Sequence, residues 1–485
     1  WMNCACGYPG RDSIFDEGGS PVIESGSRVH FVGVGGIGMS GLASVLVAQG
    51  VHVTGSDLRE NRETDVLRQL GARIHRGHSA GNVSRDLDGV IVSSAIAADH
   101  EEVLAARRHK IPVVPRLRAV ARLLQMYRSI GVAGTHGKTT TTAMIATILK
   151  AQGGNPSYLI GADCPALGGN ACLDSGEWFV TEVDESDGLL VEVRPDIAVL
   201  TNIGKDHLQT YYGLEDIERA FSQYLGQSTQ KVLCVDDQRV AALAQFLLGV
   251  TTVGINVAAD LEARELAFDR WTTTFDLYEN AVFVERVVLP APGKHNVRNA
   301  LCALAAAHLT GLPLSDAVRG LANFKLPHRR FELLEENGVT VVDDYAHLPE
   351  EIEATIQAIR AGWPGRRIIA VFQPHRYSRT KARGAEFGTA FSNVDTVVVN
   401  PIYSACESRI PGISSQHVFD AIRRDTNCAT RMIETADDTV RFLEGFIEPG
   451  DFIISFGAGD VWRVTERLAR VLEEGHFLYR VPCSI

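Results

Sequence analysis

The stretch Ala133-Gly134-Thr135-His136-Gly137-Lys138-Thr139-Thr140-Thr141-Thr142 lies between a short apolar segment, 129–132, and a segment with apolar residues at helical spacing, 143–149. This order predicts a buried strand, a glycine-rich turn and a helix. Backbone N–H groups at such a turn can bind phosphate oxygens. Lys138 would then reach the β- and γ-phosphates, and the Thr139 hydroxyl would bind Mg²⁺. The stretch therefore predicts an ATP site.

The match to the standard phosphate-binding loop is incomplete. Val132 occupies the position of the first glycine of that pattern, and the nearest glycines are Gly131 and Gly134. An ordinary strand-to-helix turn is the alternative, but it gives no reason for a lysine beside so tight a turn. We therefore predict that ATP is bound by Gly134, Thr135, His136, Gly137, Lys138, Thr139 and Thr140.

Length and charge restrict the class of protein. A chain of 485 residues exceeds one ordinary domain, so about two to four domains are expected. The composition, 45% hydrophobic and 22% charged, is that of a globular protein, and the net charge of -12 argues against nucleic acid as a partner. No apolar run reaches about 18 residues, so no membrane-spanning helix is expected. Nine scattered cysteines indicate reduced thiols and a cytoplasmic location. Residues 1–27 lack the pattern of a signal peptide, and we predict a disordered leader there.

A second glycine-rich turn lies nearer the N-terminus. A predicted strand at 28–32 leads into Gly33-Val34-Gly35-Gly36-Ile37-Gly38-Met39-Ser40-Gly41, followed by a helix near 42–49 and a strand at 51–57 that ends in Asp57. This is the order of a dinucleotide-binding half-domain, in which the glycines approach a pyrophosphate and the acidic residue binds a ribose hydroxyl. The pattern alone favours NAD, although any nucleotide diphosphate satisfies the same physics. A glycine turn without a ligand is the alternative.

Two strands of the second segment are predicted to end beside the ATP loop. One ends at Glu182, in the acidic run 182–187, and the other leads through 201–206 to His207. Because the carboxyl ends of parallel strands meet at one edge of a sheet, we expect both side chains near Lys138. With Thr139 they would bind Mg²⁺ or Mn²⁺. A solvated strand end and a hydrogen-bonded loop histidine are the alternatives.

Two further groups of polar residues are ambiguous. Asn296 and Asn299 open an alanine-rich helix, where they can cap the helix or bind an adenine edge. Arg376 and Arg379 follow a predicted strand at 367–372, where they would bind a carboxylate through paired hydrogen bonds or be solvated. The sequence leaves both questions open.

Alternating strands and helices predict an α/β protein of three domains. The first, 28–125, is Rossmann-like. The second, 126–325, is a P-loop ATPase-like domain with a mostly parallel sheet. The third, 326–485, is again Rossmann-like.

These motifs, in this order, resemble the Mur ligases, which join amino acids to a UDP-linked muramic acid. The resemblance covers about residues 28–485 and rests on the segments 33–41, 134–139, 182–187, 201–207, 293–296, 343–347 (Asp-Asp-Tyr-Ala-His) and 372–380 (Phe-Gln-Pro-His-Arg-Tyr-Ser-Arg-Thr). The last string is characteristic of the branch that joins L-alanine to UDP-N-acetylmuramate. The resemblance thus implies an ATP-dependent ligase of cytoplasmic peptidoglycan precursor synthesis, expected as a monomer or weak homodimer.

The resemblance also assigns roles to residues. The first domain would bind UDP-N-acetylmuramate rather than NAD, through Gly33, Gly35, Gly36, Ile37, Gly38, Met39, Ser40, Asp57 and Ser93. The ATP site would gain Asn296, Asn299, Arg330 and Asp344, and the metal would be bound by Thr139, Glu182 and His207. L-alanine would be surrounded by Tyr345, His347, Arg376 and Arg379. Catalysis would involve Lys138, Glu182, His207 and His347, with His347 as the proton acceptor because a histidine pKa near ~6.5 suits that task.

The chain departs from the family pattern at four positions: Arg118, Gly204, Leu348 and Cys406. None removes an assigned residue, but Leu348 borders the amino-acid pocket. No lysine lies between His207 and Lys231, so no carbamylated lysine is predicted.

Three other functions compete with this interpretation. A sister ligase that recycles a preformed peptide onto UDP-N-acetylmuramate would use the same first two domains, but segment 372–380 argues against it. An NAD-dependent dehydrogenase leaves the ATP loop without a role. A non-catalytic nucleotide-binding regulator gives no reason for Lys138, Thr139, Glu182 and His207 to be intact.

Overall fold

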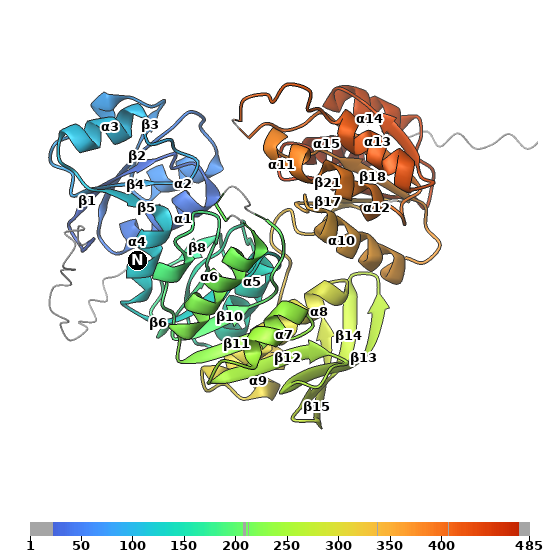
Figure 1. The fold of residues 1–485 in the computed structure, drawn as a ribbon, viewed down its shortest axis with the longest axis horizontal. Helices are drawn as coiled ribbons and strands as arrows, with labels where there is room; N and C mark the ends of the chain where they lie inside the picture. Colours follow the sequence, from blue (N-terminus) through green and yellow to red (C-terminus); the bar gives the residue numbers. More distant parts are fainter. Residues whose placement is uncertain (1–22, 207–209, 212, 337, 406, 475–485) are drawn as a thin grey trace, which may run out of the picture.

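The computed structural model describes residues 23–206, 210–211, 213–336, 338–405 and 407–474. Three α/β lobes, each built on its own sheet, follow one another along the chain (Figure 1). The predicted α/β class with three domains is confirmed, whereas the boundaries near residues 125 and 325 stay predictions. The leader was predicted too long, because the Gly26 N–H donates to the Gly50 carbonyl (2.9 Å) and residues 23–27 form a turn.

The N-terminal lobe is a parallel sheet in the order β3-β2-β1-β4-β5. Its strands are β1 (Arg28–Val32), β2 (His52–Asp57), β3 (Arg73–Arg76), β4 (Gly89–Val92) and β5 (Val113–Pro115), and its helices are α1 (Ile37–Ala48), α2 (Arg62–Gln69), α3 (Glu101–Arg108) and α4 (Arg116–Leu124). Helix α1 starts earlier than predicted, directly after Gly36, so the N–H groups of its first turn face the glycine-rich turn.

The central lobe is a ten-stranded sheet in the order β15-β14-β13-β12-β11-β10-β6-β9-β7-β8. Its strands are β6 (Arg128–Ala133), β7 (Ser157–Leu159), β8 (Ala171–Cys172), β9 (Trp178–Glu182), β10 (Ile197–Leu200), β11 (Gln230–Cys234), β12 (Val250–Ile255), β13 (Leu261–Asp269), β14 (Thr272–Glu279) and β15 (Val282–Leu289). Its helices are α5 (Lys138–Ala151), α6 (Leu214–Gly226), α7 (Gln238–Ala244), α8 (Lys294–Leu309) and α9 (Leu314–Leu321). The mostly parallel sheet was predicted, but the antiparallel pairings of β13, β14 and β15 were not.

The C-terminal lobe has the strand order β16-β17-β21-β18-β19-β20, parallel except for β16. Its strands are β16 (Glu332–Glu335), β17 (Thr340–Asp344), β18 (Ile368–Phe372), β19 (Thr396–Val399), β20 (Ala429–Met432) and β21 (Phe452–Phe456). Its helices are α10 (Pro349–Gly362), α11 (Tyr377–Arg383), α12 (Phe387–Ala390), α13 (Gln416–Asp425), α14 (Ala436–Glu444) and α15 (Trp462–Glu473). The four central strands, β17, β21, β18 and β19, are buried along their whole length, as expected for a sheet covered on both faces.

The N-terminal and central lobes share one apolar core. Leu42 and Leu46 of α1 belong to the same buried cluster as Phe179 of β9 and Tyr224 of α6. Polar contacts reinforce this junction: the Asn170 side-chain amide donates to the Ile37 carbonyl (2.8 Å). Arg118, one of the departures from the family pattern, forms a two-pronged pair with Glu192 at 2.7 and 2.6 Å. The two lobes therefore form a stable unit.

A substitution at Gly41 tests how closely α1 packs against the central lobe. A Cβ at Gly41 would lie 2.7 Å from the Asn170 side-chain nitrogen and 3.4 Å from Leu159. We expect Gly41→Ala to destabilise the protein by about 1–3 kcal/mol through overpacking, although alanine is intrinsically about 1 kcal/mol better than glycine within a helix. Urea denaturation measures the change. Gly226→Ala is the matched control, because its Cβ would meet nothing within 4 Å; equal stability of both variants would contradict the packing argument.

Candidate functional site

The predicted ATP loop connects β6, in the middle of the central sheet, to α5. Gly134 and Gly137 have φ angles of +131° and +84°, which side chains other than glycine rarely adopt. The end of the neighbouring strand β10 fixes the loop: the Thr201 hydroxyl donates to the His136 carbonyl (2.6 Å), and the His136 N–H donates to the Asn202 side chain (2.9 Å). The end of β10 thus fixes the conformation of the loop, and α5 begins directly after it.

Lys138 lies inside this loop and is nearly buried. Its ammonium donates to the Gly134 carbonyl (2.6 Å) and to Glu185 Oε2 (2.8 Å). Burial alone lowers the pKa of an ammonium, but the carboxylates of Glu185 and Asp184 outweigh it and raise the pKa of Lys138. Glu185 was not among the predicted site residues, although it belongs to the acidic run after β9 that the sequence singled out.

Glu182 ends β9 and faces the start of α5, as the parallel-strand argument predicts. The Thr139 hydroxyl donates to Glu182 Oε2 at 2.7 Å. Gly161 leaves room for the carboxylate, because a Cβ there would lie 1.9 Å from Glu182 Oε1. A hydroxyl and a carboxylate are hard oxygen ligands, which fit Mg²⁺. His207, the third predicted ligand, lies outside the described residues.

Two predicted ATP-binding residues, Arg330 and Asp344, come from the C-terminal lobe, and Arg330 reaches the start of α5. The Arg330 guanidinium donates to the Thr139 hydroxyl at 3.4 Å. The Asp344 carboxylate accepts from the N–H groups of Phe331 (3.0 Å) and Ala346 (2.7 Å). Burial, only partly offset by the Ala346 N–H and Arg330, raises the pKa of Asp344 to about 7. Asp344 and Arg330 line a cavity of about 560 Å³ together with His136, Gly137 and Thr140.

A direct contact across this cavity was not predicted. His136 Nδ1 lies 3.0 Å from Glu351 Oε1 of α10. The other carboxylate oxygen of Glu351 accepts from the backbone N–H groups of His347 (3.0 Å) and Leu348 (3.2 Å). Burial lowers the pKa of His136, but the Glu351 carboxylate outweighs it and raises that pKa overall. Glu351 therefore ties the start of α10 to the ATP loop.

The two asparagines of α8 also line the cavity. The capping alternative is wrong, because Gly293 is the N-cap and Asn296 lies within the first turn. The Asn296 amide donates to the Pro292 carbonyl (2.8 Å), and the Asn299 amide donates to Asn296 (3.2 Å). Asn299 also packs against Gly137, whose Cβ would lie 2.3 Å from Asn299 Oδ1. Contact of either residue with adenine stays a prediction.

The residues predicted to surround L-alanine cluster in the C-terminal lobe. The His347 ring stands 5.4 Å from the Tyr345 ring and 5.5 Å from that of His375. Arg379 donates to His375 Nδ1 (2.9 Å) and to Asp206 of the central lobe (3.0 Å). Arg376 Nε is buried without a hydrogen-bond partner. The alternative of two solvated arginines is therefore wrong, and Arg376 has an unused donor for a carboxylate.

The expected basicity of His347 is wrong for this state of the protein. Burial lowers the pKa of His347 to about 4, far below the value of ~6.5 on which its proposed role depended. Burial likewise lowers the pKa of His375 to about 2. Both imidazoles are neutral at pH 7. His347 Nδ1 faces the Tyr345 carbonyl at 3.2 Å, which leaves Nε2 as the acceptor.

The predicted UDP-substrate residues fall into two groups. Gly33, Gly35, Gly36, Ile37 and Gly38 form the turn and the first residues of α1, where backbone N–H groups can meet a pyrophosphate, and Ser93 follows β4 at the same sheet edge. The side chains of Met39 and Ser40 are buried, and their contact with the substrate stays a prediction. Asp57 Oδ2 accepts from the Gly35 N–H (2.9 Å), so its carboxylate also shapes the turn.

Two other departures from the family pattern bear on the site. Leu348 is buried and precedes α10, so it supports the helix start rather than forming the pocket surface. Gly204 lies beside the ATP loop, and its N–H donates to the Thr135 hydroxyl (2.7 Å). Cys406 lies outside the described residues.

This fold and site define a nucleotide-binding α/β protein with a phosphate-binding loop. Three models of known protein families match the chain in order: "Mur ligase family, catalytic domain" at residues 28–128, "Mur ligase middle domain" at 132–307, and "Mur ligase, glutamate ligase domain" at 329–459. The chain belongs to the Mur ligase family. The resemblance found in its motifs is thereby confirmed, and the dehydrogenase interpretation is not retained.

Individual relatives cover nearly the whole chain. A UDP-N-acetylmuramate–L-alanine ligase of Trichlorobacter lovleyi is 42% identical over 451 residues, which are 92% of this chain and 99% of the relative. A protein of the same name from Geobacter sulfurreducens is 41% identical over 453 residues, 92% of this chain and 98% of its own. The crystal structure of a UDP-N-acetylmuramate-alanine ligase from Thermotoga maritima superposes with a TM-score of 0.80 at 29% identity, covering 92% of this chain and 99% of its own.

Among the described residues, no helix combines the length and the apolar character needed to cross a membrane. The cytoplasmic location stays a prediction, as does the oligomeric state.

The raised pKa of Asp344 predicts a pH dependence of stability. The folded-state pKa of about 7 exceeds the unfolded value of ~3.9, so between these pH values the folded state binds more protons than the unfolded state. The free energy of unfolding should therefore fall as pH rises through this window, by at most about 1.4 kcal/mol per pH unit. Asp344→Asn should flatten this slope, whatever its effect on absolute stability.

Urea denaturation between pH 5 and 8 provides the measurement. Asp420→Asn, at an exposed position of α13, is the control and should keep the wild-type slope. Identical slopes for the wild type and Asp344→Asn would contradict the assignment.

Proposed function

We propose that this chain is a UDP-N-acetylmuramate–L-alanine ligase, which uses ATP to join the lactyl carboxylate of UDP-N-acetylmuramate to the amine of L-alanine. The observation that carries the proposal is that groups from two lobes meet at the ATP loop. His136, Gly137 and Thr140 of the central lobe line one cavity with Arg330 and Asp344 of the C-terminal lobe. Arg330 also donates to the Thr139 hydroxyl, which in turn donates to Glu182. The named relatives at 41–42% identity over 92% of the chain support the choice of substrates.

The ATP phosphates would bind at the loop and the start of α5. Lys138 is already aimed there, and the phosphates would replace Glu185 as the counter-charge of its ammonium. Asn296, Asn299, Arg330 and Asp344 would contact the rest of the nucleotide. Thr139 and Glu182 would hold Mg²⁺, which when bound supplies charge stabilisation to the phosphates.

The reaction needs ATP because a carboxylate is a poor acyl donor. Transfer of the γ-phosphoryl group to the lactyl carboxylate gives an acyl phosphate and ADP, and Lys138 would stabilise the charge on the transferred group. The neutral amine of L-alanine then attacks the acyl carbon, and phosphate leaves. Arg376, with its unused Nε–H, would bind the alanine carboxylate.

The amine must lose a proton, and His347 remains our proposed acceptor. Its Nε2 is unprotonated at pH 7, although burial makes it a weak base before substrates bind. The negative charge of the bound phosphates would raise its pKa towards neutrality. Contact between the C-terminal and central lobes would also exclude water, which otherwise hydrolyses the acyl phosphate.

Phosphate release from ATP with Mg²⁺ and UDP-N-acetylmuramate tests the proposed reaction. We expect release only when L-alanine is also present, and loss of it in Lys138→Ala. Each amino acid is added singly, and a tripeptide is added in a separate arm. Release with the tripeptide alone would assign the chain to peptide recycling. ATP binding without release with any acceptor would refute ligase activity.

A substitution at Gly161 tests whether Glu182 binds the metal ion. Since a Cβ at Gly161 would overlap the Glu182 carboxylate, Gly161→Ala should displace that carboxylate from Thr139. We expect the Mg²⁺ concentration for half-maximal activity to rise by about 10–100-fold, as for other changes that misplace a metal ligand. Gly213→Ala is the control, because its Cβ would have free space. An unchanged Mg²⁺ requirement in Gly161→Ala would exclude Glu182 as a ligand.

A further inference from the structure

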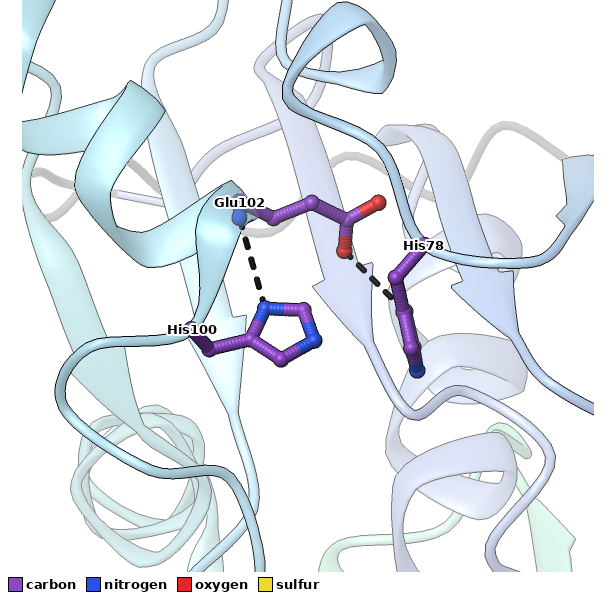
Figure 2. A group of neighbouring side chains, drawn as sticks. All are labelled: His78, His100 and Glu102. Atoms are coloured by element: carbon purple, nitrogen blue, oxygen red, sulfur yellow. Dashed lines mark hydrogen bonds and ion pairs between the residues drawn. The ribbon is translucent and has the colours of Figure 1, made fainter.

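A group of histidine and glutamate side chains lies in the N-terminal lobe, away from the residues assigned to the ligase reaction. His78 follows β3, His100 is the N-cap of α3, and Glu102 lies in the first turn of that helix (Figure 2). Each of the three side chains offers one possible ligand atom, and these three atoms all lie within 4.8 Å of one another. Two imidazoles and a carboxylate form a set of ligands that Zn²⁺ commonly uses in proteins.

The carboxylate of Glu102 is held in a fixed orientation. Its Oε2 accepts from the Ser56 hydroxyl (2.6 Å), and its Oε1 accepts from the Asn82 amide (2.7 Å) and the Ser79 N–H (3.1 Å). The side chain has no exposure to solvent. Polar partners of this kind orient the ligands of metal sites from outside the coordination sphere.

Glu102 and His78 already have the spacing of two metal ligands. His78 Nδ1 lies 3.4 Å from Glu102 Oε2. Bonds of about 2.0–2.1 Å at a tetrahedral angle place two ligand atoms about 3.3–3.4 Å apart. His78 Nδ1 now lies 2.9 Å from the Ser56 hydroxyl, which donates its own proton to Glu102, so a cation would replace the proton on Nδ1.

His100 supplies the second imidazole. Its ring stands edge-on to that of His78, with centroids 4.6 Å apart, and Figure 2 shows one of its nitrogens turned towards His78. The other nitrogen, Nδ1, receives only a long contact of 3.3 Å from the Glu102 N–H. Coordination through Nε2 moves the ring proton to Nδ1 and gives up this weak cap, which is a small loss beside a zinc–imidazole bond.

His30 also lies beside the Glu102 carboxylate. Its side chain has no exposure, its Nδ1 contacts the Thr54 hydroxyl (2.8 Å), and its Nε2 has no hydrogen-bond partner. That nitrogen faces Glu102 Oε2 at 3.7 Å. Two imidazoles, those of His78 and His30, therefore face Glu102 Oε2.

We propose that His78, His100 and Glu102 form a site for Zn²⁺ or a similar transition-metal ion in the N-terminal lobe. Mg²⁺ is excluded as its occupant because it prefers oxygen ligands. His78 and His100 are only partly buried, so an ion can enter and a water can complete the coordination. The ion would join the segment after β3 to the start of α3. Because Glu102 binds Ser56, which precedes Asp57 and its contact with Gly35, the ion would also stiffen the glycine-rich turn.

Isothermal titration of the full chain with Zn²⁺ tests the site, after treatment with a chelator and in excess Mg²⁺ to occupy oxygen-rich sites. His100→Asn removes the ligand but keeps a side chain that caps helices well. We expect Zn²⁺ binding to weaken at least about tenfold in His100→Asn and in His78→Gln. His109→Asn, at the opposite end of α3, is the matched control and should bind like the wild type.

Cobalt substitution separates this site from thiol sites, since the chain has nine cysteines. Bound Co²⁺ should show visible d–d absorption without thiolate charge-transfer bands, and His100→Asn should abolish it. Zn²⁺ should also raise the thermal midpoint of the wild type but not of His100→Asn. Equal Zn²⁺ affinity in the wild type and His100→Asn, a thiolate spectrum, or no binding in the wild type would each overturn the proposal.

Discussion

The largely buried ammonium of Lys138 is the constraint around which the central lobe is arranged. A charged group removed from water is costly unless it is paired and hydrogen-bonded. Lys138 meets this requirement through the Gly134 carbonyl and Glu185, whose side chain is itself only 2% exposed. The strand order makes this pairing available, because β9 lies directly beside β6 and its acidic run emerges next to the loop. Without nucleotide, Glu185 neutralises the charge of Lys138. When ATP binds, its phosphates can replace Glu185 as the partner of the ammonium.

The arrangement around Lys138 was largely predictable, because it follows from sheet geometry. Parallel neighbours of β6 must end at the same edge, so a strand ending in Glu182 had to approach Thr139. The Glu351–His136 contact could not be predicted in this way. Its partners are 215 positions apart, and their meeting depends on how one lobe rests on another. The predicted pKa of His347 was wrong for a similar reason. Burial determines this pKa, and a short sequence motif contains no information about burial.

The positions of helix and strand boundaries decide other features that the sequence leaves open. Whether Asn296 caps α8 or lines the cavity depends on where that helix begins, which sequence signals locate only to within a few residues. Helix α1 likewise begins earlier than predicted, so Met39 and Ser40 lie in its first turn with buried side chains. Their assignment to the substrate stays a prediction. The antiparallel strands β13 to β15 were not predicted, because no strands were assigned to residues 261–289.

The two outer lobes attach to the central lobe by different physical means. The N-terminal lobe shares an apolar core with it, and apolar burial of that extent holds two units in one arrangement. The C-terminal lobe meets the ATP site through polar pairs, Arg330 with Thr139, Glu351 with His136, and Arg379 with Asp206.

Polar pairs can separate and re-form in water at little cost, whereas an apolar contact resists exposure. The apolar contact of the C-terminal lobe lies elsewhere, where Trp271 of the central lobe packs against Trp363 and Phe331. The C-terminal lobe is therefore suited to rotate about its apolar contact at Trp271. Such a rotation would separate the polar pairs and open the ATP site. Substrates that add negative charge near Arg330, Arg376 and Lys138 would favour the closed arrangement, which is the one that excludes water from an acyl phosphate.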